Sequence, residues 1–119
     1  MTSRERFLAA LDHREPDRVP IDFGATAVTG VHATVVAALR DSFGLEKRPV
    51  KVHEPYQMLA LVEDDLRDAM GIDVEGVPGP KTLFGFPALD WKSFSLWGLD
   101  LLVPADFNTT VDSNGDLLI

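Results

Sequence analysis

The stretch IDFGATAVTG, residues 21–30, indicates the fold class of this chain. Its first three residues predict a short strand that begins after Pro20, because proline suits the start of a strand better than its middle. The other residues of the stretch predict a loop of small side chains. Apolar residues then recur at helical spacing from Val31 to Phe43, and Gly44 is placed to end that helix. A strand, a loop and a helix in this order predict an α/β fold.

A helix is also expected at the N-terminus. Thr2 and Glu5 form the pattern of a capping box, and the helix should end near Asp12. Its apolar face is expected to consist of Phe7, Leu8 and Leu11.

The middle of the chain predicts a brief extended stretch over residues 49–52 and then a helix over residues 55–70, which begins at Pro55 and ends at Gly71. The buried stripe of this helix should be Leu59, Val62, Leu66 and Met70, with Glu63 and Arg67 four residues apart on its outer face. Residues 72–77 predict the next strand, which the Pro-Gly-Pro sequence of residues 78–80 stops.

Residues 81–119 differ from the rest of the chain in composition and periodicity. They are predicted to form a β-rich excursion without helical periodicity, with its own small aromatic core or a lid, built from aromatic residues that include Phe84, Trp91, Phe94 and Trp97. Asn114-Gly115 predicts a hairpin with a type I′ turn, since both residues tolerate a positive φ. The returning arm of this hairpin is short and apolar, so we expect residues 1–119 to be the N-terminal part of a longer domain.

Composition excludes several classes of function. The chain has 119 residues, of which 45% are hydrophobic, and a net charge of -8. Residues 61–119 carry three basic and eleven acidic side chains, so we expect no binding to nucleic acid or to an anionic membrane. Without a membrane span or a signal peptide the protein is expected in the cytoplasm. The lack of cysteine excludes disulfides and cysteine-ligated metals within these residues.

Several motifs resemble the uroporphyrinogen decarboxylase family, in particular its methyltransferase-like branch. They are TSRERFLAAL at residues 2–11, PDRVPIDFG at 16–24, HEPYQMLA at 53–60, MGIDV at 70–74, and the pairs Trp97-Gly98 and Val103-Pro104. The resemblance implies a TIM (β/α)₈ barrel, of which this chain would hold the N-terminal portion. In such barrels the chemistry lies on loops after the strands, here after Phe23 and after Val77.

The same resemblance indicates which reaction to expect. Decarboxylases of the family carry an arginine-containing stretch after the first strand and a catalytic aspartate beyond the second, whereas residues 24–30 contain no basic residue and residues 78–80 are Pro-Gly-Pro. We therefore expect corrinoid-dependent methyl transfer rather than porphyrinogen decarboxylation. Zinc and a corrinoid are expected cofactors of the full-length protein only, and the isolated 119 residues should be inactive.

Five residues are candidates for substrate binding: Asp22, Gly24, His32, His53 and Glu54. Each has a structural alternative. A carboxylate such as Asp22 commonly bonds backbone amides or pairs with a nearby cation such as Arg18. The glycine needs no more than loop flexibility to explain it, and three histidines without metal-ligand spacing are weak evidence for a metal. No metal ligand is predicted within the chain.

Two functions of different class remain open from the sequence. The first is an enzyme that acts on a small-molecule substrate or a corrinoid protein. The second is a non-catalytic acidic interaction module that uses its aromatic C-terminal half. The first also predicts self-association through uncovered strand edges, whereas the second predicts a stable monomer.

Overall fold

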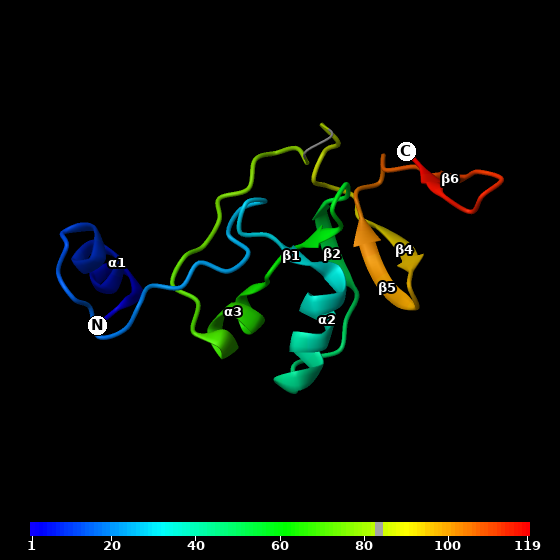
Figure 1. The fold of residues 1–119 in the computed structure, drawn as a ribbon. Helices are drawn as coiled ribbons and strands as arrows, with labels where there is room; N and C mark the ends of the chain where they lie inside the picture. Colours follow the sequence, from blue (N-terminus) through cyan, green and yellow to red (C-terminus); the bar gives the residue numbers. More distant parts are fainter. Residues whose placement is uncertain (83–84) are drawn as a thin grey trace.

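A mixed five-stranded sheet with strand order β1-β3-β2-β5-β4 organises the centre of the chain (Figure 1). The computed structural model describes residues 1–82 and 85–119, and in these residues the fold is mixed α/β. The strands of the sheet are β1 (Val31–His32), β2 (Val50–Glu54), β3 (Leu59–Ala60), β4 (Lys92–Leu96) and β5 (Leu99–Val103). β2 and β5 are parallel, with Val50 opposite Leu101, and the other neighbours are antiparallel. The expected α/β class is confirmed at this level.

The hydrophobic core lies between this sheet and α2 (Ala33–Ser42). Alternation along β2 buries Val50 and Val52, which face the same side as Leu101 and Val103 of β5. Each fully buried side chain of this size contributes roughly 1.5–3 kcal/mol. The prediction of α2 is confirmed, with the difference that His32 caps it and Val31–His32 pairs with β3.

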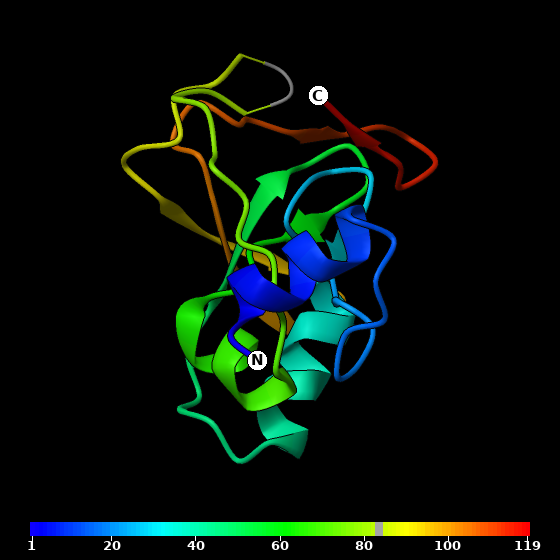
Figure 2. The ribbon, with the colours of Figure 1, turned by 90° about the vertical axis from the view of Figure 1, so that its left-hand side faces the viewer.

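The N-terminal helix α1 (Ser3–Leu11) stands at one end of an elongated molecule, 56 Å along its longest axis (Figures 1 and 2). Its capping box is confirmed, because the Glu5 N–H donates to Thr2 Oγ1 at 3.2 Å and the Thr2 N–H donates to Glu5 Oε2 at 2.8 Å. The residues of the predicted apolar face, Phe7, Leu8 and Leu11, are exposed. The helix instead buries Arg6 and Ala9, because Arg6 forms ion pairs with the rest of the chain.

The helix predicted over residues 55–70 was wrong in its first half. After β2 the chain turns, since the Glu54 carboxylate accepts the N–H groups of Tyr56 and Gln57. Leu59 and Ala60 then form β3, and α3 (Asp64–Met70) begins only after Glu63. The end of the helix is confirmed, with Gly71 in the left-handed conformation at φ 65°.

The strands predicted over residues 21–23 and 72–77 do not form as regular strands. The two segments do lie side by side, and the Asp73 N–H donates to the Ile21 carbonyl at 2.9 Å. The Ile21 N–H, however, donates to the Asp73 carboxylate rather than to a backbone carbonyl. A side chain thus occupies the donor that a ladder of strand hydrogen bonds would use.

The β-rich character of residues 81–119 is confirmed by the β4–β5 hairpin and by a second hairpin of β6 (Thr110–Val111) and β7 (Leu117–Leu118). The turn predicted at Asn114-Gly115 was wrong in type. Only Gly115 has a positive φ there, and the Asp112 carboxylate accepts the N–H groups of Asn114 and Asp116 in a longer loop. A two-residue turn with two positive φ values lies instead at Trp97-Gly98, with φ of 52° and 73°.

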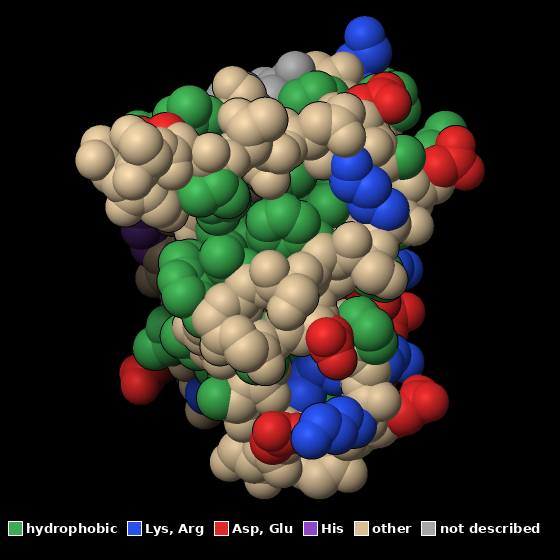
Figure 3. All heavy atoms as spheres, turned by 90° about the vertical axis from the view of Figure 1, so that its right-hand side faces the viewer, with side chains coloured by type: hydrophobic (Ala, Val, Ile, Leu, Met, Phe, Trp, Pro, Cys, Tyr) green, Lys and Arg blue, Asp and Glu red, His purple; other side chains and the backbone are tan. Residues whose placement is uncertain are grey.

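The prediction of a separate aromatic core was wrong, because Phe107 belongs to the main hydrophobic core and Phe86 and Phe94 pack against that same core. Phe107 is buried and packs edge-on against Phe86 and Phe94, with ring centroids 6.1 and 5.8 Å apart. Trp97 is exposed, and Phe84 lies outside the described residues. Apolar side chains gather at the centre of the molecular face seen from the β4–β5 side (Figure 3).

Candidate functional site

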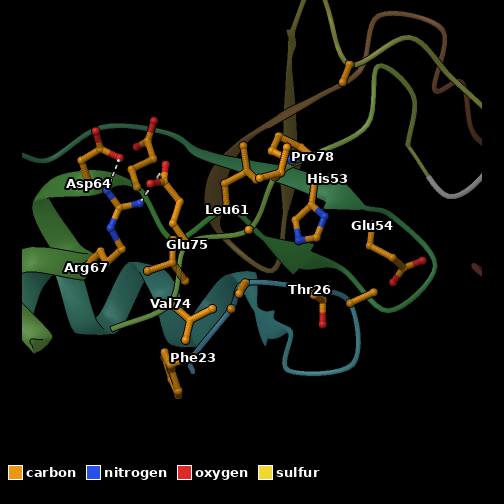
Figure 4. Close-up of a pocket in the computed structure, with 18 of the residues that line it drawn as sticks. Phe23, Thr26, His53, Glu54, Leu61, Asp64, Arg67, Val74, Glu75 and Pro78 are labelled. Atoms are coloured by element: carbon orange, nitrogen blue, oxygen red, sulfur yellow. Dashed lines mark ion pairs between the residues drawn. The ribbon is translucent and has the colours of Figure 1, made fainter. Parts of the chain in front are cut away.

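The loops after Phe23 and Val77 meet at an open cleft with a volume of about 790 Å³ (Figure 4). The cleft is lined by the first of these loops, the end of β2, the start of α3 and the segment that follows α3. Apolar side chains that include Leu61, Val74 and Pro78 form part of its wall. The two loops on which the family resemblance placed the chemistry thus border one space.

The first loop owes its shape to local hydrogen bonds. Gly24, at φ 86°, donates its N–H to the Thr29 carbonyl at 2.8 Å. Asp22 accepts the Ala25 N–H and the Thr29 hydroxyl, at 3.3 and 3.0 Å. A side chain at position 24 would also collide with Val62, since a Cβ there would lie 2.4 Å from Val62 Cγ2. Glycine at this position therefore permits both the left-handed turn and the close packing.

The backbone just before the second loop lies against the first loop. A Cβ on Gly76 would be 1.8 Å from the carbonyl oxygen of Ala25, so the two backbones touch. Ile21 lies beside Asp73. Four residues after Ile21 and three residues after Asp73, Ala25 lies beside Gly76. The segments therefore run in the same direction into the cleft.

His53 lies on β2 at the wall of the cleft. Its Nε2 atom is buried and has no hydrogen-bond partner among the described residues. Burial lowers the pKa of His53, and the negative charge of Glu54 opposes that shift only in part. The imidazole is therefore held in its neutral form near pH 7.

Glu54 does not act together with His53. The two side chains diverge from neighbouring positions of the strand (Figure 4). Both Glu54 carboxylate oxygens accept backbone N–H groups of the turn that follows β2. This residue is 1% exposed, so the structure gives it a role in shaping the turn.

The charged side chains at the α3 end of the cleft are paired with one another. Arg67 contacts Asp64 at 3.2 Å and Glu75 at 3.3 Å (Figure 4). Arg48 contacts Glu63 and Asp65, each at 3.0 Å. An anionic ligand would have to displace these carboxylates to reach either guanidinium.

The structure brings only some of the predicted site residues to the cleft. Gly24, His53 and Glu54 line it, whereas Asp22 and His32 do not. The ring of His32 lies 5.2 Å from that of Trp97, and its Nδ1 accepts the Thr34 N–H at the start of α2. The structural alternative for Asp22 holds in part: it bonds a backbone amide, but it does not pair with Arg18.

Sequence reasoning missed the ion pairs of Arg67 and the close approach at Gly76. Glu63 was expected beside Arg67, yet it contacts Arg48 and Lys51 instead. The spacing of Asp64 and Arg67, three residues apart on one helix, was the available signal for that pair. Nothing local in the sequence marks the contact between Gly76 and Ala25.

Among residues 1–82 and 85–119, no group of three or more His, Asp or Glu side chains could hold a metal ion. In the same residues no helix is long and apolar enough to cross a membrane. We compared the chain with protein families, with curated proteins and with solved structures, and found no match.

Proposed function

We propose that this chain is part of a (β/α)₈-barrel enzyme similar to the uroporphyrinogen decarboxylase family, and that the enzyme carries out corrinoid-dependent methyl transfer. One observation supports the proposal most directly. Residues 21–23 and 72–77, which the resemblance makes the first two barrel strands, lie side by side in the same direction, and the loops that follow them line one cleft. Neighbouring parallel strands with active loops at their carboxyl ends are the geometry of such barrels.

The charges of the cleft favour methyl transfer over porphyrinogen decarboxylation. A porphyrinogen substrate carries several carboxylates and needs free cations to bind them. Residues 24–30 supply none, Arg67 is held by two acidic side chains and Arg48 by three, so among the described lining residues Lys81 is the single basic side chain without an ion pair. A substrate without multiple carboxylates suits this cleft better.

The described residues do not fit the zinc site that this proposal implies for the whole protein. The chain has no cysteine, and its His, Asp and Glu side chains do not cluster in the described parts. The zinc ligands and the corrinoid contacts would therefore belong to other residues of the barrel. The cleft of this chain would contribute substrate binding only.

The test uses the complete reading frame that encodes the chain, because a barrel of this kind takes about 250 residues. The purified protein is given methylcobalamin and a thiol, and the methyl thioether is measured by mass spectrometry. We expect product from the complete protein and none from the 119-residue chain alone. Turnover by the isolated chain, conversion of uroporphyrinogen, or no methyl transfer by the complete protein would each contradict the proposal.

An acidic interaction module is the second candidate. The exposure of large apolar side chains in the C-terminal half favours it, notably Trp97 at 62% and Val111 at 65%. This function requires a partner that covers those side chains and no turnover in the methyl-transfer assay. Light scattering with thermal unfolding separates the two candidates, since the module is expected to be a stable monomer.

A further inference from the structure

The strongest feature outside the cleft is a buried carboxylate that holds three segments together. The side chain of Asp73 is 0% exposed. It accepts hydrogen bonds from Arg18 at 2.7 and 3.0 Å and from the Ile21 N–H at 2.9 Å, and Arg6 of α1 also donates to it. One carboxylate therefore joins the N-terminal helix, the segment around Ile21 and the segment after α3.

These contacts are made by the residues that come just before the two loops of the cleft along the chain. Ile21 precedes the loop that contains Ala25, and Asp73 precedes Gly76. The Asp73 N–H donates to the Ile21 carbonyl, so the Ile21 backbone is held by both its donor and its acceptor. A shift of this pair would separate Gly76 from Ala25, whose backbones touch.

The remaining bonds of the cluster hold it in place. Arg18 also donates to the Gly71 carbonyl at 2.9 Å, at the end of α3. Arg6 donates to Asp17 at 2.6 and 2.9 Å, and Asp17 in turn accepts the Arg18 N–H. The pair of Arg6 with Asp73 is buried on both sides and costly to break, since removal of one partner leaves an uncompensated charge.

We infer that Asp73 is a positioning residue of the cleft: its carboxylate fixes residues 21–23 against residues 72–74 and so determines how the Ala25 and Gly76 loops meet. Through Arg6 it also makes the docking of α1 part of the same arrangement. This inference rests on the proposed function in treating the cleft as the site. Its test measures geometry alone, so it fails or succeeds independently of methyl transfer.

The test compares Asp73→Asn with Asp17→Asn by NMR of the 119-residue chain. Both changes are isosteric, and both remove a negative charge that pairs with Arg6 and replace one acceptor oxygen with a donor, but only Asp73 contacts Ile21. We expect D73N to lose the nuclear Overhauser effect between the α-protons of Ala25 and Gly76 and to shift the Ile21 amide resonance. The amides of β2 and β5 should keep their wild-type shifts. D17N should retain the Ala25–Gly76 effect.

A purely structural role would lower the unfolding temperature without changing this contact in the folded protein. Retention of the Ala25–Gly76 effect at wild-type intensity in folded D73N therefore overturns the inference, as does its equal loss in D17N. Should D73N fail to fold, Arg18→Gln removes two bonds to Asp73 and leaves the Ile21 bond. We expect R18Q to weaken the effect, and a wild-type intensity there overturns the inference.

Discussion

At the scale of single residues, Gly76 and Gly30 should tolerate a side chain to different extents. Gly76 faces the backbone carbonyl of Ala25, which cannot move without shifting the whole loop. Gly30 faces the end of the Leu59 side chain, 2.4 Å from its hypothetical Cβ, and the nearest backbone atom there, the Ala27 carbonyl oxygen, is 3.0 Å away. A side-chain terminus can rotate, whereas a backbone oxygen held in a loop cannot.

Gly76→Ala is therefore expected to destabilise the chain by about 1–3 kcal/mol, the usual cost of forcing extra volume into packed atoms. Gly30→Ala serves as the matched control and should cost less, because Leu59 can yield. Urea denaturation of both variants measures the difference. Equal losses of stability, or a larger loss for Gly30→Ala, would show that the Gly76–Ala25 contact is not tight in solution.

At the scale of elements, ion pairs rather than apolar packing dock α1. The pKa of the buried Asp73 illustrates this. Burial alone would raise it, but the Ile21 N–H, the Ser3 hydroxyl, Arg18 and Arg6 together lower it to about 2 from its ordinary 3.8. Folding thus favours the ionised carboxylate, and its contribution is present above the ordinary value and lost as the pH falls through about 2.

We expect the melting temperature of the chain to fall as the pH is lowered from about 4 to about 2. Asp73→Asn should make this fall shallower, because the variant lacks the group that must be protonated. Asp17, whose pKa Arg6 holds well below its usual range, keeps part of the slope. Circular dichroism melts across this pH range provide the measurement, with Asp116→Asn in the far hairpin as the control. An unchanged slope in D73N would contradict the assignment.

The sequence predicts the elements whose determinants are local. The capping box of α1, the glycine at the end of α3 and the second hairpin depend on neighbouring residues and were found correctly. The first half of the helix expected from Pro55 was not, because Leu59, which fits the helical spacing, pairs with β2 as part of a strand together with Ala60. That pairing depends on the turn formed by Glu54, which no local pattern indicates.

The candidate site also has parts that the sequence indicates and parts that it does not. The two loops of the cleft were identified through the family resemblance, and Gly24, His53 and Glu54 were named from the sequence. The ion pair of Arg67 with Glu75 joins a helix to the segment that follows it, and the cluster around Asp73 joins residues distant along the chain. Contacts of that kind follow from the tertiary arrangement, which spacing alone does not give.

At the scale of the whole molecule, the five-stranded sheet ends in β1 and β4, whose outer edges have no partner strand in the described parts. β4 is the longer edge, with half-buried Phe94 and Leu96 alternating with exposed Ser93 and Ser95. Unprotected edges of this kind pair with other chains. Self-association of the chain through β4 therefore remains a prediction.

Ser95→Lys should reduce that association, since a charged side chain on an edge strand opposes pairing. Ser42→Lys at the end of α2 adds the same charge at an exposed position away from the edge, and it should leave association unchanged. Sedimentation velocity over a range of concentrations measures both. A monomeric wild-type chain at all concentrations would exclude the edge-pairing prediction and favour the interaction module.

The anchoring of α1 also has a consequence for the order of folding. Arg6 and Asp73 are 67 residues apart in the chain, so their contact closes a long loop. The contact can offset the entropic cost of closing such a loop only after α3 and the residues around Asp73 are in place. The capped helix can form early on its own, but its attachment should be among the last steps. In hydrogen exchange, the amides of α1 should be among the first to open.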